Sequence, residues 1–327
     1  MKSRFSPFNL VLIVAVMSGA QLFARAQAAS PTPSPTPSVS PADDEGQENT
    51  RGAFLTSRPK TVEKPKSTTT TAPPPHRSRR RPAVATNSST SGTTATSGTS
   101  VAGTSGANSD PAKKKPVQQK MGLGMTLFMR DANGLAVRVE PTHEFHKGDR
   151  VRVLLETNAD GHLYIFNTTD DGPPVMIYPD AQLDEAGNYL QAHVPLEIPS
   201  SVATEENLRW FRFDEHQGVE RLYFVFTREP LAGAPIEDDL IKYCGGDQTN
   251  CAWHPSTEMW ARLQKELSTS TSFAKTVTEG KAQTGTEHDA ATRGIGLARD
   301  DPEPSLVMMT AATNKGLLVT SIDLFHR

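Results

Sequence analysis

Gly148–Pro179, with the sequence GDRVRVLLETNADGHLYIFNTTDDGPPVMIYP, is the stretch that most constrains how this chain can fold. Short apolar segments alternate there with turn-forming residues, which is typical of consecutive β-strands. The three predicted strands are Arg150–Thr157, His162–Asn167 and Val175–Tyr178. The turns at residues 158–161 and 170–173 consist mainly of Asn, Asp, Gly and Pro, which let a chain reverse. We therefore expect a β-meander whose second strand, apolar on both faces, lies between two layers.

The same alternation of apolar and polar residues predicts further strands on both sides of this stretch. They are Gly122–Arg130, Leu135–Val139, Val194–Ile198, Leu208–Phe213, Arg221–Thr227 and Gly316–Arg327. Asn133-Gly134 predicts a hairpin between the first two, and Asp214–Gly218 predicts another between the fourth and the fifth. Short helices are predicted at Pro235–Tyr243 and Ser256–Leu267.

These elements predict a mainly β fold, an antiparallel β-sandwich of immunoglobulin-like or jelly-roll-like type with one or two short helices, preceded by a disordered tether. A partly closed barrel is the alternative, and the predicted helices either cap the sheet or form a separate lobe. Composition suggests the domain boundaries, because residues 31 to about 120 have almost no large apolar side chains. The predicted parts are a signal peptide (1–28), a disordered basic linker rich in Pro, Ser, Thr and Gly (29–120), the β-sandwich (121–231), a helical and disulfide-bonded extension (232–268), a disordered insertion (269–304) and a C-terminal strand returning to the domain (305–327).

The formal charge of −3 conceals a basic linker joined to an acidic domain. Residues 31–120 hold 13 Lys and Arg against 6 Asp and Glu, a charge of +7, whereas residues 121–327 hold 18 against 31, a charge of −13. An acidic domain disfavours nucleic acid as the partner of the folded part. The linker is expected to be a solvated spacer, with contact to anionic polymers, lipid headgroups or wall material as the alternative.

The first residues have the layout of an export signal. Lys2 and Arg4 precede the apolar run Leu10–Met17, and A-x-A cleavage sites follow within Ala24–Ala28. The run is shorter than the ~20 residues of a membrane-spanning helix, although an uncleaved anchor is the alternative. No later segment is apolar enough to cross a bilayer. The mature chain is therefore expected to have no transmembrane span and to be periplasmic or extracellular.

Cys244 and Cys251, the two cysteines of the chain, predict a structural disulfide. Export would place them in an oxidising compartment, and the Gly-Gly and Asn between them suit a short ring. The C-x6-C spacing is not a redox motif, and two thiols alone make a poor zinc site.

Catalytic signatures are absent from the sequence: it has no nucleophile elbow, Walker loop, dinucleotide fingerprint or H-E-x-x-H. The G-x-G of Gly122–Gly124 precedes a strand instead of opening a helix, so it predicts no phosphate site. The spacing of Ser200 and Ser201 from His193 and Asp214 supports no nucleophilic triad. We therefore predict no catalytic, cofactor-binding or metal-binding residue and no cofactor.

Three weaker patterns leave alternatives open. His143, Glu144 and His146 could bind zinc with a further ligand, although polar surface residues are the favoured interpretation. The aromatic residues Trp210, Tyr164 and Tyr178 are a possible ligand surface, such as a carbohydrate-stacking platform led by Trp210, although most aromatic residues are expected in the core. Acidic and amide side chains in the predicted loops could converge on calcium, although turns favour the same residues. They are Asn158, Asp160, Asp170, Asp171, Asp180 and Asp184.

With these strands laid out, the domain resembles the exported, largely acidobacterial proteins that carry the domain of unknown function 4384. The most telling residues are DGHLYIFN (160–167) followed by the YP of PPVMIYPD (173–180). GLGMTLFMRDANG (122–134), AVRVEPTHEFHKGDRVRVLLETNADGHLYIFNT (136–168), HVPLEIP (193–199), WFRFDE (210–215) and ERLYFVFTREPL (220–231) extend the resemblance over about 122–231. It implies a small β-sandwich module without established activity, one that has a recognition role, and it supplies no catalytic residue.

The function expected from these observations is that of an exported, non-enzymatic binding or interaction module that recruits a protein or an envelope polymer. The alternative is a metal-dependent hydrolase acting on envelope glycans, with His143, Glu144 and His146 as its first candidate residues. A purely structural spacer is the third possibility.

Overall fold

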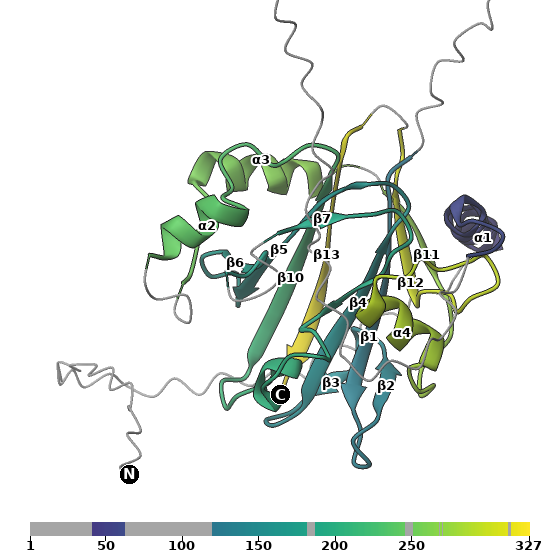
Figure 1. Cartoon of the computed structure of the whole chain (residues 1–327), viewed down its shortest axis with the longest axis horizontal. Helices are drawn as coiled ribbons and strands as arrows, with labels where there is room; N and C mark the ends of the chain where they lie inside the picture. Colours follow the sequence, from purple (N-terminus) through teal and green to yellow (C-terminus); the bar gives the residue numbers. More distant parts are fainter. Residues whose placement is uncertain are drawn as a thin grey trace, which may run out of the picture. The chain divides into compact units, whose positions relative to one another are not determined.

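Two β-sheets packed face to face form the centre of the protein (Figure 1). The computed structural model describes residues 41–62, 120–181, 187–245, 251–267, 269, 271–312 and 315–327. Within these residues, sheet A has seven strands and sheet B has six. The predicted mainly β sandwich with short helices is therefore confirmed.

Sheet A has the strand order β11-β12-β1-β4-β8, with β2 paired to β1 and β9 paired to β4. Its strands are β1 (Gly122–Arg130), β2 (Ala136–Val139), β4 (Arg150–Thr157), β8 (Leu196–Ile198), β9 (Phe211–Arg212), β11 (Thr271–Lys275) and β12 (Leu306–Thr310). The predicted hairpin at Asn133-Gly134 is confirmed, because β1 and β2 pair antiparallel from Leu127 with Val139 to Arg130 with Ala136.

Sheet B has the order β3-β13-β10-β5-β6, with β7 paired to β5. Its strands are β3 (Glu144–Phe145), β5 (Gly161–Thr169), β6 (Val175–Tyr178), β7 (Tyr189–Leu190), β10 (Gly218–Thr227) and β13 (Leu317–His326). β13 pairs with β10 along its whole length, from Leu317 with Thr227 to His326 with Gly218. The C-terminal segment thus lies in sheet B as the strand next to β10.

Two predicted strand connections were wrong. β4 lies in sheet A and β5 lies in sheet B, so residues 158–161 cross between the sheets, and only β5 and β6 form part of the expected meander. Asn158 explains this crossing, because its side chain accepts from Gly122 N (2.6 Å) and donates to Lys120 O (2.8 Å), which ties the end of β4 to the start of β1. β9 and β10 likewise lie in different sheets instead of forming a hairpin.

The main core lies between the two sheets, where one side-chain face of each sheet is apolar. Met125 and Leu155 pair across β1 and β4, and Ile165 and Phe224 pair across β5 and β10. All four side chains are at most 2% exposed. Burying an aliphatic or aromatic side chain in this way stabilises the fold by roughly 1.5–3 kcal/mol each.

Helices cover the outer faces of both sheets (Figure 1). They are α1 (Pro41–Ser57) and α4 (Gly285–Arg293) on sheet A, and α2 (Glu237–Cys244) and α3 (Thr257–Leu267) on sheet B. Leu240, Met259 and Leu263 pack against the outer residues Phe166 and Tyr223 of sheet B. The two predicted helices therefore cap the sheet. The predicted disulfide is also confirmed, because Cys244 at the end of α2 is bonded to Cys251.

Two segments predicted to be disordered contain regular structure. α1 falls within the predicted linker, and β11 and α4 fall within the predicted insertion 269–304. Composition did not predict this regular structure, because these segments pack with few large apolar side chains. α4 is held by a capping box between Thr284 and Glu287 and by the small side chain of Ala291 against sheet A. The predicted signal peptide and residues 63–119 of the predicted linker lie outside the described residues.

Candidate functional site

The outer face of sheet A carries buried ion pairs. Strand alternation places Arg152, Leu154 and Glu156 of β4 on this face, away from the apolar core. Three Arg–Glu pairs among the described residues have side chains that are at most 6% exposed, namely Arg58–Glu156, Arg138–Glu287 and Arg152–Glu197. Buried charges are rare unless they are paired, so this face is the most unusual polar feature that the structure describes.

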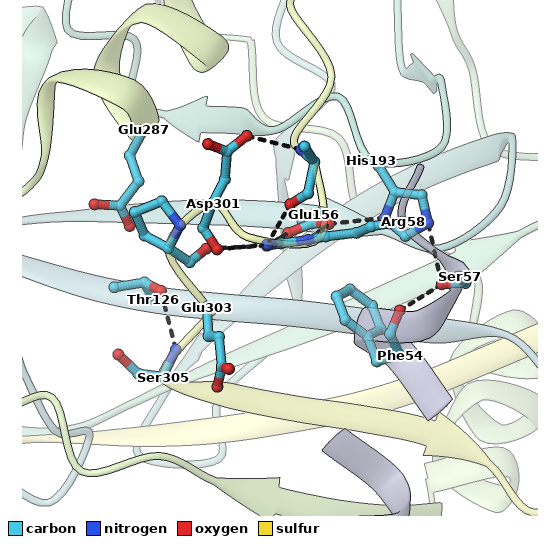
Figure 2. A network of polar contacts seen from close by, with 12 residues as sticks. Phe54, Ser57, Arg58, Thr126, Glu156, His193, Glu287, Asp301, Glu303 and Ser305 are labelled. Carbon is cyan, nitrogen blue, oxygen red and sulfur yellow. Dashed lines mark hydrogen bonds and ion pairs between the residues drawn. The ribbon is translucent and has the colours of Figure 1, made fainter. Parts of the chain in front are cut away.

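Arg58, the residue after α1, lies at the centre of a buried polar network (Figure 2). Its Nε and Nη2 donate to the two carboxylate oxygens of Glu156, at 2.8 and 2.6 Å. Nη1 donates to the carbonyl oxygens of Ala298 (3.2 Å) and Asp301 (3.0 Å), and Nη2 also donates to that of Pro302 (3.1 Å). A guanidinium has five N–H donors, so each of them has an acceptor.

Phe54 is the apolar companion of Arg58, one helical turn earlier in α1. It is fully buried against Ala274, Val307 and Met309 of β11 and β12. Gly122 and Gly124 lie on the same face of β1, where a Cβ on Gly122 would be 2.9 Å from the Phe54 ring and a Cβ on Gly124 3.0 Å from it. The G-x-G therefore forms a slot into which an aromatic ring fits.

Pro304 closes the other side of this slot. A Cβ on Gly124 would be 2.8 Å from its Cγ atom. Pro304 belongs to the loop between α4 and β12, the same loop that supplies the carbonyl oxygens around Arg58. The slot around Phe54 and the acceptor oxygens around Arg58 are therefore parts of one continuous contact with residues 54–58.

His193 connects Glu156 to the end of α1 (Figure 2). Its Nδ1 is 2.8 Å from Glu156 Oε1, and its Nε2 is 3.1 Å from Ser57 Oγ. The residue adopts a left-handed backbone conformation (φ 60°), which is uncommon for a side chain of this size. Its backbone also accepts from Leu297 N (2.7 Å), so the ring, the strand and the loop above Arg58 are held together.

The order Glu156–His193–Ser57 is that of a hydrolase triad, but its surroundings differ. The Ser57 hydroxyl has one proton and two acceptors, because Phe54 O lies 2.5 Å from Ser57 Oγ. Both carboxylate oxygens of Glu156 are bound by Arg58, and the His193 ring is buried. These contacts hold the segment that follows α1 on the sheet. They explain why the three side chains lie together without invoking a catalytic reaction.

The two other ion pairs fasten neighbouring elements. Arg138 Nη2 donates to Glu287 Oε1 (2.5 Å), which joins β2 to α4. Arg152 Nη1 donates to Glu197 Oε1 (3.0 Å), and the guanidinium lies 3.9 Å from the centre of the Trp210 ring. Burial lowers the pKa of Arg152 below its ordinary value, and the charge of Glu197 opposes that shift.

The structure does not bring the predicted ligand-surface residues together. Tyr164 is fully buried and Tyr178 is 3% exposed, so the prediction that they form a surface was wrong for both. They point into apolar clusters because aromatic residues fill the sandwich and the space beneath α2 and α3. Burial also raises the pKa of Tyr164. Trp210 is half-buried, and the guanidinium of Arg152 covers its ring.

The H-x-x-H residues also point apart. The His143 ring packs on Phe145, Glu144 lies 3.7 Å from Arg327, and the exposed His146 lies 3.9 Å from Asp149. No cluster of three or more His, Cys, Asp or Glu suited to a metal ion occurs in the part of the chain that the structure describes.

The loop residues considered for calcium have separate partners. Asp160 accepts from Ala192 N, Asp170 accepts from Val219 N, and Asp171 pairs with Arg221. Asp184 lies outside the described residues. The acidic loops are thus explained by turn geometry.

Sequence patterns did not single out Phe54, Arg58 or Glu156. Two signals were available. Glu156 is a charged residue that directly follows the apolar run Val153–Leu155 of β4, and two glycines at alternate positions of β1 must share one face. Neither signal identifies a partner more than 60 residues away.

Comparison with known families finds a match for one segment of the chain. The family model described as "Domain of unknown function (DUF4384)" matches residues 144–230, which run from β3 past the end of β10. Among curated proteins no match was found, and none was found among solved structures. Among the described residues, no helix is both long enough and apolar enough to cross a membrane. Residues 144–230 of the sandwich thus match the model of the DUF4384 family.

Proposed function

We propose that the protein is an exported, non-enzymatic interaction module whose sandwich recruits a protein or an envelope polymer. The observation that carries this proposal is the docking of residues 54–58 on sheet A. The face that holds them supplies a fitted aromatic slot and a charged partner for Arg58, and both are typical of peptide recognition. The disulfide is compatible with an exported protein.

Saturable retention of the mature chain on cell envelopes tests the proposal. Immobilised chain would be offered wall polymer freed of protein and, separately, detergent-solubilised envelope proteins, with excess soluble chain as competitor. We expect one fraction to be retained and then displaced by the competitor. If neither fraction shows competed binding, the proposal is wrong.

The same experiment separates this proposal from the metal-dependent hydrolase. The double substitution His143→Ala/His146→Ala is expected to leave retention unchanged, because both side chains lie away from the docked segment. Stoichiometric zinc in the purified protein, lost in this variant together with cleavage of envelope glycans, would contradict a non-enzymatic role.

A further inference from the structure

The segment Pro41–Val62 is held to the sandwich by two large buried side chains and by surface hydrogen bonds, such as Lys275 N to Gln47 Oε1 (3.1 Å) and Arg299 Nη2 to Thr56 O (2.7 Å). Among its large side chains, Phe54 and Arg58 are the ones buried by the sheet, whereas most other residues of α1 are exposed or half-exposed. Gly46 and Gly52 lie within the helix with no neighbouring atom within 4 Å of their Cβ positions. Each such glycine costs a helix about 1 kcal/mol relative to alanine, so α1 depends on its two anchors.

All acceptors around Arg58 belong to the sandwich and to the loop that precedes β12. Glu156 comes from β4, and the carbonyl groups of Ala298, Asp301 and Pro302 come from the loop that precedes β12. The site offers five acceptor oxygens, which match the five N–H donors of a guanidinium. A lysine ammonium has three donors and no fork geometry, so it would leave part of the site unpaired.

A buried ion pair seldom adds net stability compared with apolar residues of the same volume, but it discriminates between ligands. An apolar contact would have fastened α1 at least as firmly. The saturated guanidinium contact next to an aromatic slot therefore has the chemistry of a specific recognition site.

We propose that Glu156, the three loop carbonyl groups and the Gly122–Gly124 slot form a receptor site for a helical peptide segment that ends in arginine and has an aromatic residue four positions earlier. Phe54 and Arg58 occupy this site from the same chain, and a second polypeptide with the same two residues binds there when they leave. The inference rests on the proposed function, since it names the ligand class of the proposed module.

Peptide binding in trans tests this site in the full chain. Phe54→Ala/Arg58→Ala removes both anchors, and a fluorescein-labelled peptide with the sequence of residues 41–62 is the probe. We expect saturable binding by fluorescence anisotropy to the variant chain and at least tenfold weaker binding to the unmodified chain, whose own segment competes. An Arg58→Lys peptide is expected to bind at least tenfold more weakly than the native peptide.

The matched control peptide carries Lys60→Arg, because Lys60 lies two residues after Arg58 and is exposed. Its affinity is expected to equal that of the native peptide. Absence of saturable binding, or equal affinity of the Arg58→Lys peptide, would overturn the proposal.

Should the doubly substituted chain be unfolded on its own, the native peptide is expected to refold it, and far-ultraviolet circular dichroism would report the gain of structure. Failure of the native peptide to do so, or equal refolding by the Arg58→Lys peptide, counts against the site. Envelope retention can fail while the peptide still binds, so the two proposals are tested separately.

Discussion

At the scale of single residues, buried charge distinguishes the outer face of sheet A. Arg152 is nearly inaccessible, and its guanidinium contacts Glu197, Arg209 O and the Trp210 ring. Burial lowers its pKa, but a guanidinium remains protonated at any pH at which the protein is folded. The pair with Glu197 is therefore a permanent charge contact.

Removing one member of this pair should destabilise the protein strongly. Glu197→Leu leaves the Arg152 charge buried without a carboxylate, and we expect a loss of about 3–5 kcal/mol in the free energy of unfolding, measured by urea denaturation. Glu215→Leu is the control, because the Lys147–Glu215 pair is exposed and its loss should leave the midpoint unchanged. Equal losses in the two variants would contradict this account.

Asp214 and His216 form an exposed pair with pH-dependent strength. The hydrogen bond to Asp214 raises the pKa of His216 above 6.5, while hydrogen bonds from His216 lower the pKa of Asp214. The stabilisation from His216 is complete below its ordinary pKa and is lost as pH rises through the raised value. The stabilisation from Asp214 is present above its ordinary pKa and is lost as pH falls through the lowered value.

The pair is therefore strongest in mildly acidic solution. Asp214→Asn is expected to return the pKa of His216 toward 6.5 in an NMR titration of its ring resonances. Glu215→Gln should have a smaller effect, because Glu215 contributes least among the causes of the shift. A pKa that does not change on Asp214→Asn would refute the assigned cause.

At the scale of elements, α1 is positioned by the glycines of β1. Gly124→Ala places a Cβ 2.8 Å from Pro304 and 3.0 Å from Phe54, so the slot must open. Overpacking of this kind costs about 1–3 kcal/mol, and we expect roughly tenfold or greater loss of hydrogen-exchange protection in α1. Gly52→Ala, which adds a Cβ in open space within the same helix, should increase protection. Greater hydrogen-exchange protection of α1 in Gly124→Ala than in Gly52→Ala would contradict docking through the slot.

The disulfide stabilises the cap of sheet B. Cys244 and Cys251 are seven positions apart, and closing a ring of about eight residues corresponds to about 2.5 kcal/mol in the chain-entropy account. Cys244→Ser/Cys251→Ser should lower the free energy of unfolding by about that amount. The strand signal in circular dichroism should persist in this variant. Reductant should destabilise the unmodified chain to the same extent and leave the double variant unaffected; a variant that also responds would disprove the assignment.

At the scale of the whole molecule, the sandwich extends beyond the segment matched by the DUF4384 model. β4 pairs with β1 over seven residues and β10 pairs with β13 over ten, and both partners lie outside residues 144–230. A fragment of residues 144–230 would thus expose the edges of its central strands and the core residues that face β1, β12 and β13.

We expect this fragment to be unfolded in circular dichroism, whereas the chain from residue 41 to residue 327 should unfold in a single cooperative thermal transition. A cooperative transition in the isolated fragment would show that β1 and β13 are dispensable. Residues 120–327 alone provide the intermediate case, and they should be less stable than 41–327 because Glu156 then lacks Arg58.

Much of the secondary structure was predictable from local patterns. Alternation at Arg150–Thr157 and the apolar run at His162–Asn167 lie within β4 and β5, and the acidic first turn of Thr257–Leu267 lies in α3. α1 was not predictable, because among its described residues it buries one large side chain, Phe54, which packs on the distant strands β11 and β12.

The sequence by itself determined that the chain is mainly β, where most of the long strands lie and which cysteines pair, because side-chain periodicity and ring closure are local properties. Only the tertiary structure decided that β4 and β5 lie in different sheets, that β13 completes sheet B and that Arg58 meets Glu156. Strand partners and buried ion pairs join residues far apart in the chain, and their free energy depends on the shape of the whole core.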